Sequence, residues 1–133
     1  MKKYQCPTNF VGILGTRAEY KKRIFVLVVD DDKEITSFIG SALQNTKYLP
    51  ITANEPDTAA KLLDYFEFDL IICDVVMPKL EGLELVDRIA PNTPVIFISG
   101  FEQSLSIENR TRHYLKKPFS IESLIEKIEK ISA

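Results

Sequence analysis

The chain has no tryptophan, one histidine and two cysteines among its 133 residues, and this scarcity excludes several kinds of site. Cys6 and Cys73 lie far apart and form no C-x-x-C pair, so a zinc site built from cysteine and histidine is not expected. We expect both thiols to be reduced, as is typical of a cytoplasmic protein.

Long apolar runs are also missing. No stretch approaches the roughly 20 apolar residues that a transmembrane helix needs. After Lys2 and Lys3 the only apolar stretch near the N-terminus is 10–14, which Gly12 interrupts, and it is too short for a secretory signal. We therefore predict no association with a membrane.

Neither sign of charge dominates, since 17 lysines and arginines face 19 acidic residues and the net charge is -2. The distribution is uneven, because residues 1–23 carry six basic residues against Glu19 alone and leave the remainder acidic. An acidic remainder attracts cations rather than nucleic acid, so we predict no direct nucleic acid binding. The length suits one compact domain, and 45% hydrophobic with 27% charged residues is typical of a soluble globular chain.

Two regions of the chain differ in pattern. Residues 1–22 show no clear periodicity and are interpreted as an N-terminal extension of unknown role, whereas residues 23–133 form the predicted domain. There, short apolar runs alternate with longer stretches of helical period. This favours an α/β fold with a doubly wound, five-stranded parallel sheet and helices on both faces. The predicted strands are 24–29, 48–53, 69–73, 94–99 and 112–115.

Helices are predicted over 56–66, 81–90 and about 102–109, and at two further places where apolar residues recur every three or four positions. The first of these two helices would bury Ile35, Phe38, Ile39, Ala42 and Leu43. The other would bury Ile121, Leu124, Ile125, Ile128 and Ile131.

Acidic residues gather where predicted strands end. Asp30, Asp31 and Asp32 follow the first strand, and Asp74 follows the third. Singly, such residues often only cap helices: Asp31 and Glu34 have the spacing of a capping box, and Asp74 could open a turn. Together, on adjacent strands one and three, carboxylates repel one another unless a cation is bound. Oxygen ligands without histidine or cysteine favour Mg2+.

The fourth and fifth predicted strands also end in polar groups. Ser99 supplies a hydroxyl, and Gly100 has no side chain to block a ligand. Lys117 alone reads as a surface lysine, but Pro118 restricts the backbone where the lysine must be aimed inward. Carboxylates, a metal ion, a hydroxyl and an ammonium group together are suited to binding and moving a phosphoryl group.

Four segments resemble the conserved blocks of bacterial two-component response-regulator receiver domains. They are VLVVDDD at 26–32, DLIICDVVMPKLEG at 69–82, VIFISG at 95–100 and YLKKPF at 114–119. The most specific is D-x-x-M-P-x-x-x-G after an apolar strand, and the likeness spans residues 24–131. The resemblance implies a flavodoxin-like sheet in the order 2-1-3-4-5 and a stand-alone receiver similar to the chemotaxis regulators.

The resemblance also implies a role for each acidic position. Asp74 matches the phosphoacceptor. Asp31 would bind Mg2+ directly and Asp30 through water, while Asp32 is an extra, exposed acid. The backbone carbonyl of Val76, two residues after the acceptor, matches another metal ligand.

The remaining matches concern the phosphoryl group and the switch. Ser99 would hydrogen-bond a phosphoryl oxygen, Lys117 would pair with its charge, and Tyr114 matches the aromatic residue whose rotamer reports activation. The phosphoryl donor would be a sensor histidine kinase or a histidine phosphotransfer protein, and a downstream target protein would bind at helix four and strand five. Such a protein is a signalling switch and not an enzyme, apart from Mg2+-dependent self-phosphorylation and slow self-dephosphorylation.

Two alternatives to the switch differ in what the site does. A receiver-like module could act only through protein contacts, without phosphorylation. A Mg2+-dependent phosphatase would use an aspartyl nucleophile in a D-x-D-x-T/V motif on the first strand, which residues 30–34 do not supply. A nucleotide or flavin site would want a glycine-rich or Ser/Thr-rich loop there, where three aspartates stand instead.

Overall fold

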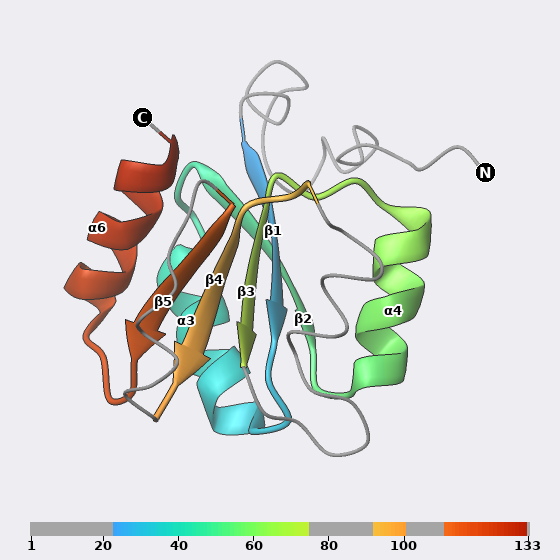
Figure 1. The fold of residues 1–133 in the computed structure, drawn as a ribbon, viewed down its shortest axis with the longest axis horizontal. Helices are drawn as coiled ribbons and strands as arrows, with labels where there is room; N and C mark the ends of the chain where they lie inside the picture. Colours follow the sequence, from blue (N-terminus) through green and yellow to red (C-terminus); the bar gives the residue numbers. More distant parts are fainter. Residues whose placement is uncertain (1–22, 75–91, 101–110, 133) are drawn as a thin grey trace.

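The computed structural model describes residues 23–74, 92–100 and 111–132. The predicted extension over 1–22 and the predicted helices over 81–90 and 102–109 lie outside these residues. The elements, in chain order, are β1 (Ile24–Val29), α3 (Lys33–Leu43), β2 (Tyr48–Ala53), α4 (Pro56–Tyr65), β3 (Leu70–Asp74), β4 (Val95–Ser99), β5 (Arg112–Lys116) and α6 (Ile121–Ser132) (Figure 1).

The five strands form one parallel sheet in the order β2-β1-β3-β4-β5, as predicted. Strand β3 runs from Leu70 to Asp74, one residue later than predicted, and Asp69 lies in the bend that precedes it. The amide of Asp69 donates to Phe25 O at 2.8 Å, and its Oδ2 accepts from Phe25 N at 2.8 Å. Asp74 is therefore the last residue of a strand and pairs with Ile98 of β4.

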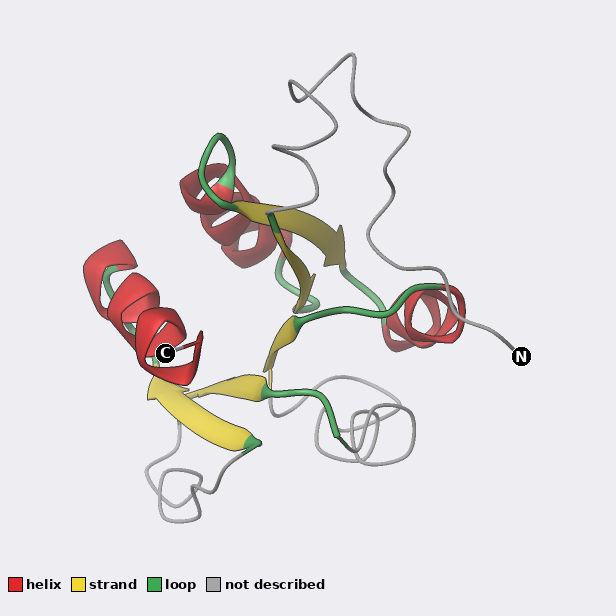
Figure 2. Ribbon diagram, turned by 90° about the horizontal axis from the view of Figure 1, so that it is seen from above, coloured by secondary structure: helices red, strands yellow, loops and turns green. Residues whose placement is uncertain are grey.

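The sheet buries two cores, because successive side chains of a strand point to opposite faces. On one face α4 packs over a core that includes Phe25, Leu27, Val29, Ala59, Leu63, Ile71, Cys73, Val95, Phe97 and Tyr114. On the other face α3 and α6 cover a core that includes Val26, Val28, Ile39, Leu43, Ile72, Ile96, Ile98, Leu124 and Ile128. Figure 2 shows the sheet between α4 on one side and α3 with α6 on the other, which confirms helices on both faces.

Helix α3 faces the sheet through Thr36, Ile39 and Leu43, and the prediction that Phe38 is buried is wrong. The side chain of Phe38 is 47% exposed. Residues three and four apart share a helix face, whereas Phe38 is turned by about 100° from Ile39. Its ring lies beside that of Phe119, with the centroids 6.3 Å apart. Among the described helices, none is long and apolar enough to cross a membrane.

Candidate functional site

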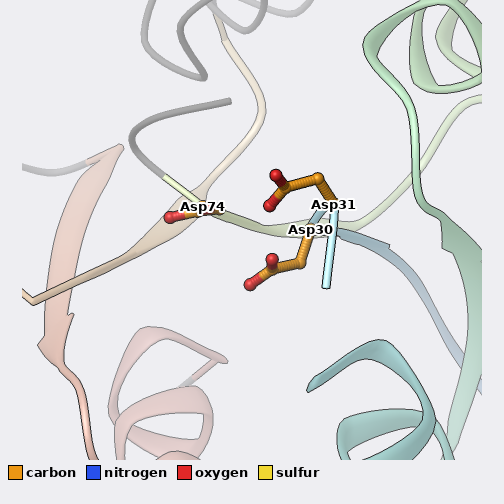
Figure 3. Close-up of side chains that lie close together, drawn as sticks. All are labelled: Asp30, Asp31 and Asp74. Carbon is orange, nitrogen blue, oxygen red and sulfur yellow. The ribbon is translucent and has the colours of Figure 1, made fainter. Parts of the chain in front are cut away.

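Three carboxyl groups meet at the carboxyl end of β1 and β3 (Figure 3). The register places Val29 opposite Cys73, so that Asp30 and Asp74, the next residues, are neighbours. One carboxyl oxygen each from Asp30, Asp31 and Asp74 lies within 4.8 Å of the others. Asp30 is buried, Asp74 is partly buried and Asp31 is exposed, so the cluster opens to solvent at Asp31.

Side chains hold the turn between β1 and α3. Oδ1 of Asp30 accepts from the amide of Asp32 at 2.9 Å, and Oδ1 of Asp32 accepts from the amide of Glu34 at 2.9 Å. The N-cap of α3 is therefore Asp32, and the capping-box interpretation of Asp31 is wrong. Asp32 is exposed as predicted, but it is the cap of the helix and not merely an extra acid. Because Asp32 takes this role, the Asp31 carboxyl group is left in the acidic cluster.

The ammonium group of Lys117 balances part of this negative charge. Its Nζ lies 3.1 Å from Asp30 Oδ2 and 3.7 Å from Asp74 Oδ1. The backbone places it there, since the amide of Lys117 donates to Ser99 O at 2.7 Å where β5 ends. The lysine side chain is only 29% exposed, because it lies against the acidic cluster instead of extending into solvent.

The pKa values reflect this crowding. Burial raises the pKa of Asp30, although the hydrogen bond from the Asp32 amide and the ammonium group of Lys117 act in the opposite direction. Burial also lowers the pKa of Lys117, but its hydrogen bond and charge attraction to Asp30, with a further contribution from Asp74, outweigh burial and raise it overall. Lys117 therefore stays protonated, while the ionised form of Asp30 is held at a cost.

Two further predicted site residues, Ser99 and Tyr114, lie on the neighbouring strands β4 and β5. Ser99, the last residue of β4, is 2% exposed, and a Cβ at the next residue, Gly100, would meet nothing within 4 Å. Tyr114 on β5 is 8% exposed, and its ring centroid lies 5.5 Å from that of Phe97. Phe97 and Ser99 share a face of β4, so Ser99 and Tyr114 are both neighbours of Phe97.

Asn54, which directly follows β2, is a site-forming residue that the sequence interpretation missed. Its Nδ2 donates to Asp30 O at 2.9 Å and to Thr36 Oγ1 at 2.8 Å. The rule that polar residues after parallel strands meet at one edge of the sheet also applies to β2, and it would have found Asn54.

The acidic cluster has the composition of a site for a hard divalent cation. Its donors are carboxylate oxygens from Asp30, Asp31 and Asp74, with one ammonium group beside three acids. The thiol of Cys73 is not a competing ligand, because it is buried and burial raises its pKa, which keeps it protonated. The residues present therefore fit Mg2+. The predicted carbonyl ligand, Val76, lies outside the described residues.

Comparison with known proteins gives a consistent result. The family model described as "Response regulator receiver domain" matches residues 26–129. The nisin biosynthesis regulatory protein NisR of Lactococcus lactis is 34% identical over 110 residues, which is 78% of this chain and 48% of NisR. The response regulator receiver protein CpdR of Brucella abortus is 31% identical over 113 residues, 80% of this chain and 94% of CpdR.

Solved structures agree with the sheet order. The receiver domain of the Francisella response regulator 1452 superimposes with a TM-score of 0.70 at 33% identity, over 82% of this chain and 96% of that one. The chain thus spans about half the length of NisR but nearly all of CpdR and of the Francisella domain.

Proposed function

This chain belongs to the response regulator receiver family, whose members are phosphoacceptor signalling switches, and we propose that Asp74 is its phosphoacceptor and a phosphohistidine partner its donor. Receivers of this family interact with histidine kinases or phosphotransfer proteins. The observation that carries the proposal is the position of Lys117, whose Nζ reaches both Asp30 and Asp74 in a cluster of three carboxyl groups.

Asp30, Asp31 and Asp74 would hold Mg2+, which supplies positive charge to the oxygens of the phosphoryl group when it is bound. A carboxylate oxygen of Asp74 attacks phosphorus in line, an O–P bond forms, and the N–P bond to the histidine breaks. The imidazole leaves with the bonding electron pair, and the product is an acyl phosphate. Lys117 pairs with the charge of the phosphoryl oxygens, as its distance of 3.7 Å from Asp74 Oδ1 allows.

The same residues suggest how phosphorylation is relayed. The hydroxyl of Ser99 would donate to a phosphoryl oxygen, and its movement would leave space beside Phe97 into which Tyr114 settles. In the family resemblance this change is read at strand β5 and the predicted helix over 102–109, and we propose that surface for the downstream target. Slow loss of the phosphoryl group to water would reset the switch.

The first experiment is intact-mass measurement after incubation with Mg2+ and a small acyl-phosphate donor. Wild type should gain one phosphoryl group, while Asp74→Asn and a wild-type sample in EDTA should gain none. Asp69→Asn is the matched control, because Asp69 precedes the same strand at its other end and the amide oxygen can still accept from Phe25 N. Gain of phosphate by Asp74→Asn would contradict the assignment. No gain by wild type, also with a histidine-phosphorylated donor, would favour the module that acts only through protein contacts.

A further inference from the structure

We propose that Asn54 is a positioning residue of the acidic site, which orients the peptide between Asp30 and Asp31 so that both carboxyl groups face a bound cation. This inference rests on the proposed Mg2+ site. Asn54 touches neither the carboxyl groups of the cluster nor Lys117 through any described hydrogen bond, so its effect is transmitted through the backbone.

The amide group of Asn54 uses both of its hydrogens. One bonds to Asp30 O at 2.9 Å and the other to Thr36 Oγ1 at 2.8 Å. The hydroxyl of Thr36 donates in turn to Lys33 O at 3.2 Å, within the first turn of α3. Asn54 therefore links the end of β2 both to the last residue before the acidic turn and to the helix that follows it.

The bond to Asp30 O constrains the geometry of the site. This carbonyl belongs to the peptide group whose nitrogen is that of Asp31, so fixing its direction limits the directions available to the Asp31 side chain. The other side of Asp30 is fixed as well, because its amide donates to Ala53 O at 3.1 Å. Without Asn54, the buried carbonyl of Asp30 would lose this partner and the peptide could rotate toward another donor.

Holding the Asp30–Asp31 peptide matters because the ionised carboxyl groups of the cluster tend to move apart. Three carboxyl groups within 4.8 Å repel one another, and the exposed Asp31 is the one that can turn toward solvent to relieve the repulsion. A bond that holds the Asp30–Asp31 peptide opposes that movement. Residues that orient metal ligands in this way commonly change metal affinity about 10-fold to 100-fold when they are removed.

The test is the dissociation constant for Mg2+, measured by isothermal titration calorimetry on metal-stripped protein without any phosphoryl donor. Asn54→Ala should weaken Mg2+ binding about 10-fold. Thr36→Val removes the second acceptor of Asn54 together with the hydroxyl's own bond to Lys33 O, but it leaves the bond to Asp30 O in place and should weaken Mg2+ binding less. Thr36→Ser keeps the hydroxyl and should bind Mg2+ as wild type does. Asn54→Ser, whose hydroxyl is too short to reach both acceptors, takes the place of Asn54→Ala if the latter does not fold.

Thr46→Val is the matched structural control. The hydroxyl of Thr46 donates to Leu43 O and accepts from Tyr48 N, at the far end of α3. Its loss should lower the unfolding temperature in EDTA without changing the Mg2+ dissociation constant.

The outcomes separate the two proposals. If Asn54→Ala lowers the unfolding temperature as Thr46→Val does and leaves the dissociation constant at the wild-type value, Asn54 is only a structural tie and the inference is wrong. If wild type itself binds no Mg2+ and gains no phosphate, the proposed function fails instead. Where the inference holds, the Mg2+ concentration for half-maximal phosphorylation should rise in Asn54→Ala more than the rate at saturating Mg2+ falls.

Discussion

The pKa of Asp30 is subject to opposing influences. Asp30 is 1% exposed, accepts from the Asp32 amide, and has Lys117 at 3.1 Å and the carboxyl groups of Asp31 and Asp74 nearby. Burial outweighs the favourable contacts and raises its pKa from 3.8. The folded protein therefore binds this proton more tightly than the unfolded chain does. The contribution of Asp30 to stability is present below pH 3.8 and is lost as the pH rises through the folded-state pKa.

This sign predicts how Asp30→Asn behaves in EDTA. The free energy of unfolding of wild type should fall relative to that of the variant as the pH rises from about 4 to 7. The reason is that only wild type must ionise a buried acid. Urea unfolding at both pH values measures this fall. Asp57→Asn, at an exposed position on α4, is the control. The raised pKa would be contradicted if the free energy of unfolding of wild type stayed constant, or rose, relative to that of Asp30→Asn as the pH increased.

At the scale of elements, α6 shows how one helix face carries most of the packing. Leu124 and Ile128 are 0% exposed against the sheet, whereas the ion pair between Lys130 and Glu126 is 3.7 Å long and about 70% exposed on both sides. The apolar face should therefore dominate stability, and the exposed ion pair should contribute little.

Leu124→Ala should lower the free energy of unfolding by about 2–5 kcal/mol, since it leaves a cavity in the core beneath α6. Lys130→Ala, on the same helix, should leave the urea midpoint almost unchanged. Chemical unfolding followed by circular dichroism measures both variants. Equal losses in the two would contradict the dominance of the buried face, because the exposed ion pair would then contribute as much as Leu124.

At the scale of the whole molecule, folding creates the cation site, because β1 and β3 come together only in the sheet. A cation that binds the folded state and not the unfolded chain stabilises it by about 2.7 kcal/mol at 100 times the dissociation constant.

Mg2+ should accordingly raise the unfolding temperature of wild type, by an amount that grows with the Mg2+ concentration. Asp31→Asn should lose most of the rise, because the exposed ligand of the cluster is neutralised. Differential scanning calorimetry in NaCl of matched ionic strength provides the control. If NaCl alone gives the same rise, charge screening and not a specific site would be responsible.

Much of the fold could be predicted because the signals are local. Strands β1 and β2 have the predicted bounds, since short, mostly apolar runs between polar residues need no information from elsewhere in the chain. The ends of β3 and β5 differ by one residue from the prediction, because backbone pairing with Ile98 and Ser99 includes Asp74 and Lys116 in the ladder. Pairing is a relation between distant segments, which a sequence pattern does not contain.

The composition of the candidate site was likewise determined by sequence alone: Asp30, Asp31, Asp74 and Lys117 each follow or end an apolar run at which parallel strands deliver their side chains to one edge. Tertiary structure decided how these groups are used. The capping of α3 by Asp32, the exposure of Phe38 and the bonds of Asn54 to Asp30 and Thr36 each depend on the distance and direction between segments that only packing brings together. Local patterns specify which groups reach the edge of the sheet, and register and side-chain packing specify which partner each group finds there.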